Sequence, residues 1–204
     1  NANPTVAVSS GSICNGSSFP MVPSGASSYV YTGGSAIVSP STNSSYTVTG
    51  TSALGCTNTA VATVTVNANP TVAVNSGSIC NGSSFTMIPS GASTYVYSSG
   101  AALVSPTTNT SYTVTGTSVV GCTNTAVSNV TVNAIPSVAV NSGSICSGKS
   151  FTMTPTGAST YVYSGGSAIV SPTSNASYTV TGTSAGCSNT AVASVTVNAN
   201  PTVV

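Results

Sequence analysis

The chain has 204 residues, one lysine and no arginine, aspartate, glutamate or histidine, which gives a formal net charge of +1. This composition lacks the side chains that usually perform general acid and base catalysis and the carboxylates that bind calcium. The histidines that tetrahedral zinc sites usually combine with cysteine are absent as well. It also lacks the clustered basic residues that bind phosphate, so we expect no enzymatic activity, no metal, no cofactor and no nucleic-acid partner.

Two further classes of protein are disfavoured by the distribution of apolar residues. No run of about 18 apolar residues occurs, so no membrane insertion is expected. The hydrophobic content of 40% argues against a disordered polar tract, because disorder goes with low hydrophobicity and high net charge.

Three copies of one unit make up the chain, because Cys14, Cys80 and Cys146 follow one another at intervals of 66 residues. The predicted repeats are 1–66, 67–132 and 133–197, and 198–204 starts a fourth repeat or supplies an inter-subunit strand. The phrase "NANPT" opens the chain and returns at Asn198. We therefore expect either cuts through a longer array or a subunit that continues into its neighbour.

Within each copy, an "SF" segment, a "YVY" segment, an "SYTVTG" segment and a "VTVN" segment follow one another, and each alternates its side chains with a period of two. That period is typical of half-buried strands, and clusters of Gly, Pro, Ser and Asn separate the segments. We predict an all-β protein of three tandem antiparallel β-sandwich domains, each with about six or seven short strands. The predicted core residues are Phe19, Met21, Tyr31, Tyr46, Val48, Val64, Phe85, Met87, Tyr97, Tyr112, Phe151, Met153, Tyr163 and Tyr178.

Each repeat also carries two cysteines, and a domain this small buries only about 60% of its unfolded surface. A disulfide within each repeat would close a loop of about 42 residues and contribute on the order of 4 kcal/mol. Six strands would bring the two cysteines to one end of the sandwich, whereas seven would separate them unless a long loop carried one across. Buried free thiols and links between chains are the alternatives. The expected pairs are Cys14 with Cys56, Cys80 with Cys122, and Cys146 with Cys187.

A disulfide in each repeat implies an oxidising compartment, so the predicted location is extracellular, at the cell surface or secreted. The linker "VNANPTV" is short and contains proline, which restricts its own φ and that of its predecessor. Stiff linkers predict an extended rod with about 35 to 40 Å per repeat. The linker prolines are Pro4, Pro70, Pro136 and Pro201.

Sheet edges without charged residues predict self-association, either head to tail or side by side. The terminal "NANPTVV" either continues the chain or supplies a first strand across a subunit junction. Surface glycans are a further candidate partner, through stacking on Tyr29 and Tyr31, although core packing also accounts for these rings. The Asn-X-Ser/Thr sequons indicate glycosylation or turn chemistry; they begin at Asn15, Asn43, Asn81, Asn109, Asn129 and Asn175.

The string "GSICNGSSF…SGASSYVYTGG…SYTVTGTSALGCTNTAVATVTVNANPTV" resembles the immunoglobulin-like tandem repeats of large Bacteroidota surface and secreted proteins, many exported by the type IX system. The chain departs from them at Tyr31, Tyr97 and Tyr163, where the family usually has tryptophan, and it lacks the aspartate of their "DANGC" motif. The resemblance implies immunoglobulin-like domains in cell-surface stalks or adhesive fibres. The predicted function is an extracellular structural protein without catalytic activity; the alternative is an adhesin segment that binds carbohydrate or another cell surface.

Overall fold

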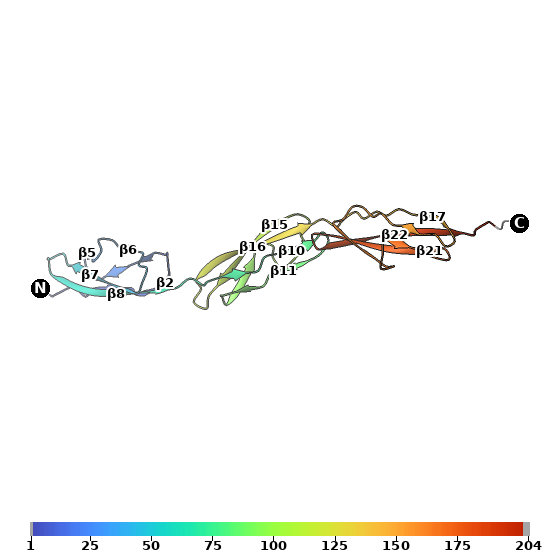
Figure 1. Cartoon of the computed structure of the whole chain (residues 1–204). Helices are drawn as coiled ribbons and strands as arrows, with labels where there is room; N and C mark the ends of the chain where they lie inside the picture. Colours follow the sequence, from blue (N-terminus) through green and yellow to red (C-terminus); the bar gives the residue numbers. More distant parts are fainter. Residues whose placement is uncertain (1, 202–204) are drawn as a thin grey trace. The chain divides into compact units, whose positions relative to one another are not determined.

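In the computed structural model, residues 2–201 are described, and their regular secondary structure consists of β-strands without a helix (Figure 1). The prediction of an all-β protein is confirmed. No helix in this range is long and apolar enough to cross a membrane.

The first repeat folds as a four-stranded sheet, in the order β2-β8-β7-β5, with two two-stranded sheets, β1-β4 and β3-β6. Six short strands precede two long ones, because Gly, Pro and Ser interrupt the first part of the repeat, whereas Thr and Val dominate its second part. The strands are β1 (Ala7–Val8), β2 (Gly11–Cys14), β3 (Phe19–Pro20), β4 (Pro23–Ser24), β5 (Ser28–Tyr31), β6 (Ile37–Val38), β7 (Ser44–Thr51) and β8 (Thr57–Asn67).

The second repeat has the same pattern, with sheets β10-β16-β15-β13, β11-β14 and β12-β9. Its strands are β9 (Ala73–Val74), β10 (Gly77–Cys80), β11 (Phe85–Thr86), β12 (Pro89–Ser90), β13 (Thr94–Tyr97), β14 (Leu103–Val104), β15 (Thr110–Thr117) and β16 (Thr123–Asn133).

The third repeat forms the sheets β17-β22-β21-β19 and β18-β20, and a single bridge between Ala139 and Thr156 replaces its third strand pair. Its strands are β17 (Gly143–Cys146), β18 (Phe151–Thr152), β19 (Thr160–Tyr163), β20 (Ile169–Val170), β21 (Ala176–Ser184) and β22 (Cys187–Asn198).

By its internal contacts the chain divides into two compact units, and the division runs through the second repeat. The first unit comprises Asn1–Val74, Pro89–Ser98 and Thr113–Val127, and the second comprises Asn75–Ile88, Ser99–Tyr112 and Ser128–Val204.

Burial follows the predicted alternation in the first repeat. In β8, Ala62 and Val64 are buried while Val61, Thr63 and Thr65 are exposed. Side chains from the four-stranded sheet and from the short strands meet in one core, which makes each repeat a two-layer sandwich. In the first repeat, the buried centre of the core consists of Met21, Val48 and Ala62. The partly buried residues that pack against this centre are Val8, Phe19, Tyr29, Tyr31, Val38 and Tyr46.

The third repeat has an equivalent core, and the predicted core residues of all three repeats lie on inward-facing positions. Met21, Val48, Val64, Met87 and Met153 are buried. The predicted aromatic residues are half-buried, because their large rings reach the rim of a thin core; they are Phe19, Tyr31, Tyr46, Phe85, Tyr97, Tyr112, Phe151, Tyr163 and Tyr178.

One strand pair in each repeat departs from the antiparallel prediction. Strand β2 runs parallel to β8, with Gly11 opposite Val64 and Cys14 opposite Asn67. By contrast, β7 is antiparallel to both β5 and β8. Because β2 and β8 point the same way, the cysteine that ends β2 lies where β8 also ends.

Candidate functional site

The sites with the most distinctive chemistry are the junctions between repeats, where two disulfides lie. Cys14 of the first repeat bonds to Cys122 of the second, with 5.5 Å between their Cα atoms. Cys80 of the second repeat bonds to Cys187 of the third, with a Cα–Cα distance of 5.6 Å. Because the two cysteines of each bond belong to successive repeats, both disulfides connect one repeat to the next. Each disulfide lies inside one of the two compact units.

The predicted disulfide within each repeat is wrong, and the parallel pairing of β2 with β8 gives the reason. Cys14 lies opposite Asn67 at the end of β8, whereas Cys56 directly precedes Thr57, the first residue of β8. Eleven residues of strand separate these two ends by about 36 Å, at roughly 3.3 Å per residue. A disulfide requires Cα atoms about 5.5 to 6 Å apart, so Cys14 and Cys56 cannot pair. The same register places Cys80 opposite Asn133 and Cys146 opposite Asn198.

The second cysteine of each bond is presented by the hairpin before the last long strand. In the second repeat, the Ser118 N–H donates to the Cys122 carbonyl at 2.8 Å, and the Gly121 N–H donates to the Ser118 carbonyl at 3.0 Å. Gly121 has a φ of 84°, which places it in the left-handed region that closes a three-residue hairpin loop. The Cys122 side chain is buried at this end of the strand.

The linker between the first two repeats is held from both sides by asparagine side chains. The Asn69 Nδ2 donates to the Asn15 carbonyl at 3.2 Å, and the Asn124 Nδ2 donates to the Pro70 carbonyl at 3.0 Å. Asn58 and Asn189 make the same contact with Pro4 and Pro136. The linker is thus tied to the domains that flank it.

The four predicted linker prolines differ in exposure, since Pro4, Pro70 and Pro136 are buried and Pro201 is exposed. The asparagines that donate to the carbonyls of the buried prolines are absent from the predicted site residues. Their regular position in the sequence could have identified them. The same amide recurs two residues after the hairpin cysteine in all three copies, as Asn58, Asn124 and Asn189.

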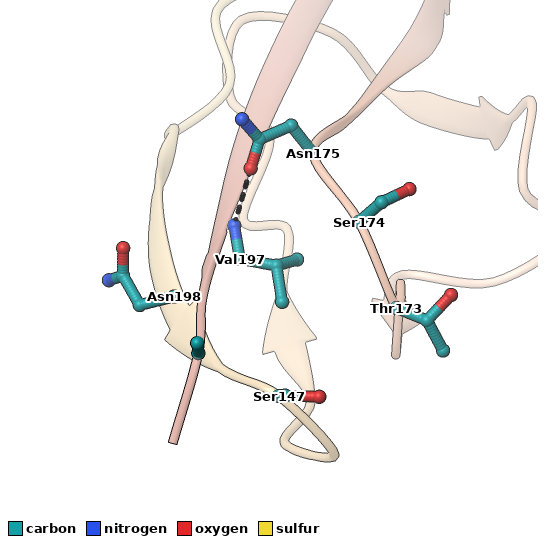
Figure 2. A pocket seen from close by; sticks show the side chains of 7 residues that line it. Ser147, Thr173, Ser174, Asn175, Val197 and Asn198 are labelled. Carbon is teal, nitrogen blue, oxygen red and sulfur yellow. Dashed lines mark hydrogen bonds between the residues drawn. The ribbon is translucent and has the colours of Figure 1, made fainter. Parts of the chain in front are cut away.

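Two clefts lie beside the last long strands of the first and third repeats, and both are lined by uncharged residues. One, of about 550 Å³, brings Val120 of the second repeat's hairpin next to Ser12, Thr65 and Asn67 of the first repeat. The other, of about 530 Å³, lies at the end of β22 and is shown in Figure 2. There the Asn175 Oδ1 accepts a hydrogen bond from the Val197 N–H at 2.8 Å (Figure 2).

The two remaining cysteines, Cys56 and Cys146, carry free thiols. Cys56 is half-buried and Cys146 is exposed, whereas Cys122 and Cys187 are 0% and 1% exposed. Within residues 2–201, no group of three or more histidine, cysteine or acidic side chains is placed to hold a metal ion.

The tyrosines considered for glycan stacking take part in the fold. The Tyr29 hydroxyl donates to the Ala26 carbonyl at 3.0 Å and accepts from the Ala26 N–H at 2.8 Å. The rings of Tyr29 and Tyr31 pack against the first repeat's core. The sequon residues Asn43, Asn109 and Asn175 likewise have a structural role, since each Oδ1 accepts a backbone N–H of the last long strand.

Comparisons with known proteins give structural similarity alone. No protein-family model matches the chain, and no curated protein matches it. A three-domain immunoglobulin fragment of titin is 10% identical, with a TM-score of 0.41, over 97% of this chain and 100% of that fragment. Immunoglobulin domains of Sidekick-1 give 10% identity and a TM-score of 0.34 over 96% and 76% of the two chains. Extracellular domains of Drosophila OTK give 10% identity and a TM-score of 0.39 over 76% and 71%.

Proposed function

We propose that this chain is an extracellular structural protein whose tandem immunoglobulin-like repeats form a cell-surface stalk or a filament. The observation that carries the proposal is the pair of disulfides that join successive repeats, Cys14 to Cys122 and Cys80 to Cys187. Each disulfide is a second covalent connection beside the linker, so tension between two repeats is shared by the linker and the disulfide. Such bonds form and persist in oxidising compartments outside the cytosol.

The composition supports the same proposal. A chain without aspartate, glutamate or histidine has no ordinary general acid or base, so the proposed role includes no catalysis. Its single lysine, Lys149, leaves one site for trypsin-like proteases, which suits a durable extracellular material. The resemblance to Bacteroidota surface repeats agrees with this role and suggests that source.

The proposed structural unit is the sequence repeat, with boundaries 1–66, 67–132 and 133–197. We assign 198–204 to the start of a further repeat or to an inter-subunit strand; residues 202–204 of this segment lie outside the described residues. The eleven-residue strand β8 sets the length of a unit at about 36 Å, since each residue of a strand advances about 3.3 Å.

Electron microscopy of the native, unreduced material tests the proposal. We expect filaments far longer than three repeats, with an axial spacing of about 35 to 40 Å. A reduced and alkylated sample is the control, and it should contain shorter or more flexible particles. Isolated short particles in the unreduced sample would contradict a fibre and favour the adhesin alternative, which binding to immobilised glycans would then test.

A further inference from the structure

We propose that the two overlapping disulfides limit how far the chain can be stretched. When tension unfolds the repeats, it passes through residues 80–122 alone, and residues 15–79 and 123–186 stay slack. The inference rests on the proposed structural function, because it concerns how such a chain carries tension. It assigns a mechanical role to the order in which the four bonded cysteines follow one another.

The covalent topology provides a short route through both bonds. Along the chain the order is Cys14, Cys80, Cys122 and Cys187, and the first cysteine bonds to the third while the second bonds to the fourth. A route that uses one bond contains either the 66 residues from Cys14 to Cys80 or the 65 residues from Cys122 to Cys187. A route that uses both bonds contains only the 42 residues between Cys80 and Cys122, followed backwards.

Tension in a network of connected chains is carried by the shortest route, which becomes taut first. At roughly 3.5 Å per residue, the 42-residue route extends to about 150 Å, whereas each one-bond route extends to about 230 Å. Residues 15–79 and 123–186 are therefore still slack when residues 80–122 are fully extended. The same routes exist whatever residues precede Cys14 or follow Cys187.

In the folded second repeat, the two disulfides attach at opposite ends of the strand β16. Cys122 directly precedes Thr123, the first residue of β16, and Cys80 lies opposite Asn133, the last. Strands β10 and β16 are parallel, so tension between the two attachments pulls β10 by its end and β16 by its beginning. The two strands are thus loaded in opposite directions along their length, and the hydrogen bonds between them share the load.

Side chains add to the hydrogen bonds between these two strands. The parallel ladder covers Gly77–Cys80 of β10. Ahead of it, the Asn129 N–H donates to the Ser76 Oγ at 2.9 Å, and the Ser128 Oγ donates to the Asn75 carbonyl at 2.6 Å. Tension from the disulfides therefore acts across a strand pair that is hydrogen-bonded ahead of β10 as well as along it.

Single-molecule force spectroscopy of the 204-residue chain, held by handles at its two ends, tests the proposal. All samples carry Cys56→Ser and Cys146→Ser, so that neither free thiol exchanges with the disulfides. With both bonds intact, about 72 residues span the handles, and we expect the unfolded chain to become taut at about 250 Å. With a reducing agent, the same molecules should reach about 710 Å.

Two further variants, each without one bond, test the overlap of the loops. Cys14→Ser/Cys122→Ser keeps the second bond, and Cys80→Ser/Cys187→Ser keeps the first. In either variant about 95 residues span the handles, so both should become taut at about 330 Å. Loss of one bond thus adds far less length than loss of the second, whereas separate loops would add independent lengths.

The single trypsin site gives a direct test of which segment carries tension. Lys149 is exposed and lies in 123–186, which the proposal leaves slack. Cleavage after Lys149 should leave the chain with both bonds attached to both handles and taut at about 250 Å. The same cleavage should break the tether of Cys80→Ser/Cys187→Ser, because its route passes through Lys149.

The comparison with and without reducing agent changes none of the four bonded cysteines, so it holds even where a variant fails to fold. Breakage of the doubly bonded chain on cleavage after Lys149 would overturn the proposal, and so would an unreduced length near that of the reduced chain. Filaments whose chains show either result would overturn this inference and leave the proposed function standing. The expected lengths in a chain that forms no filament would support this inference and contradict the proposed filament.

Discussion

The Cα atoms of Cys14 and Cys122 lie 5.5 Å apart although 108 residues separate them along the chain. The bond between them encloses most of the first repeat, the linker and most of the second repeat. Cys80 and Cys187 repeat this arrangement across 107 residues. The two loops overlap, so the second repeat is covalently attached to both of its neighbours.

Removal of one junction disulfide should lower stability and loosen the linker. In the Cys14→Ser/Cys122→Ser double variant, we expect a loss of about 2 to 4 kcal/mol, since the unfolded chain gains the freedom of a long loop. Denaturant unfolding measures the loss, and hydrogen exchange at Ala68 and Asn69 reports the linker. The Cys56→Ser/Cys146→Ser variant keeps both bonds and should match the unaltered chain. Equal midpoints for the two double variants would contradict this prediction.

Gly11 should not tolerate a methyl group. A Cβ at this position would lie 2.6 Å from the Cε2 of Phe19, whose ring packs over the glycine. Gly11→Ala should therefore destabilise the first repeat by about 1 to 3 kcal/mol, because the ring has to move out of a packed core. Thermal unfolding measures the effect. The exposed neighbour Ser12, changed to alanine, is the matched control and should cost little.

Ala185 is under backbone strain, because it has a φ of 48° in the two-residue turn between Ser184 and Cys187. Left-handed backbone costs a residue with a Cβ about 1 kcal/mol, and glycine avoids that cost. We expect Ala185→Gly to raise the unfolding free energy of the third repeat by about that amount. Ala53→Gly, in the longer hairpin of the first repeat, is the control. A destabilising Ala185→Gly change would show that the turn is unstrained.

Asn124 should stabilise the junction through its amide nitrogen. Asn124→Ala removes the donor to the Pro70 carbonyl and the acceptor for the Thr125 N–H, and should cost about 1 to 2 kcal/mol. Asn124→Asp retains the acceptor and removes the donor, which separates the two contributions. Faster hydrogen exchange in the linker, with little change in the sheet, is the expected result for both variants. Unchanged linker exchange would argue that Pro70 is held by packing alone.

Stability should be independent of pH between about 4.5 and 6.5. Aspartate, glutamate and histidine are the side chains whose reference pKa values lie near this range, and the chain contains none of them. With no side chain that changes its proton binding there, the linkage slope is close to zero. Denaturant unfolding across this range should therefore give one midpoint. A reproducible shift of the midpoint with pH would contradict the prediction.

The repeat, the strand content and the inward face of each strand follow from local patterns in the amino-acid sequence. Alternating side chains such as Ala62, Thr63 and Val64 decide which face is buried, because a period of two leaves each residue only two directions. That pattern is local, so it can be read without knowing which strands are neighbours. The absence of aspartate, glutamate and histidine is likewise a property of composition alone.

The pairing of the cysteines, by contrast, depends on how distant strands are arranged in the folded chain. The spacing of Cys14 and Cys56 suggested a bond within one repeat, and the outcome depended on whether the first and last strands are parallel. Strand pairing joins residues that are far apart in sequence, and no local pattern specifies its direction. The parallel pairing of β2 with β8 puts these cysteines at opposite ends of the sheet and places Cys14 beside the next repeat, where Cys122 completes the bond.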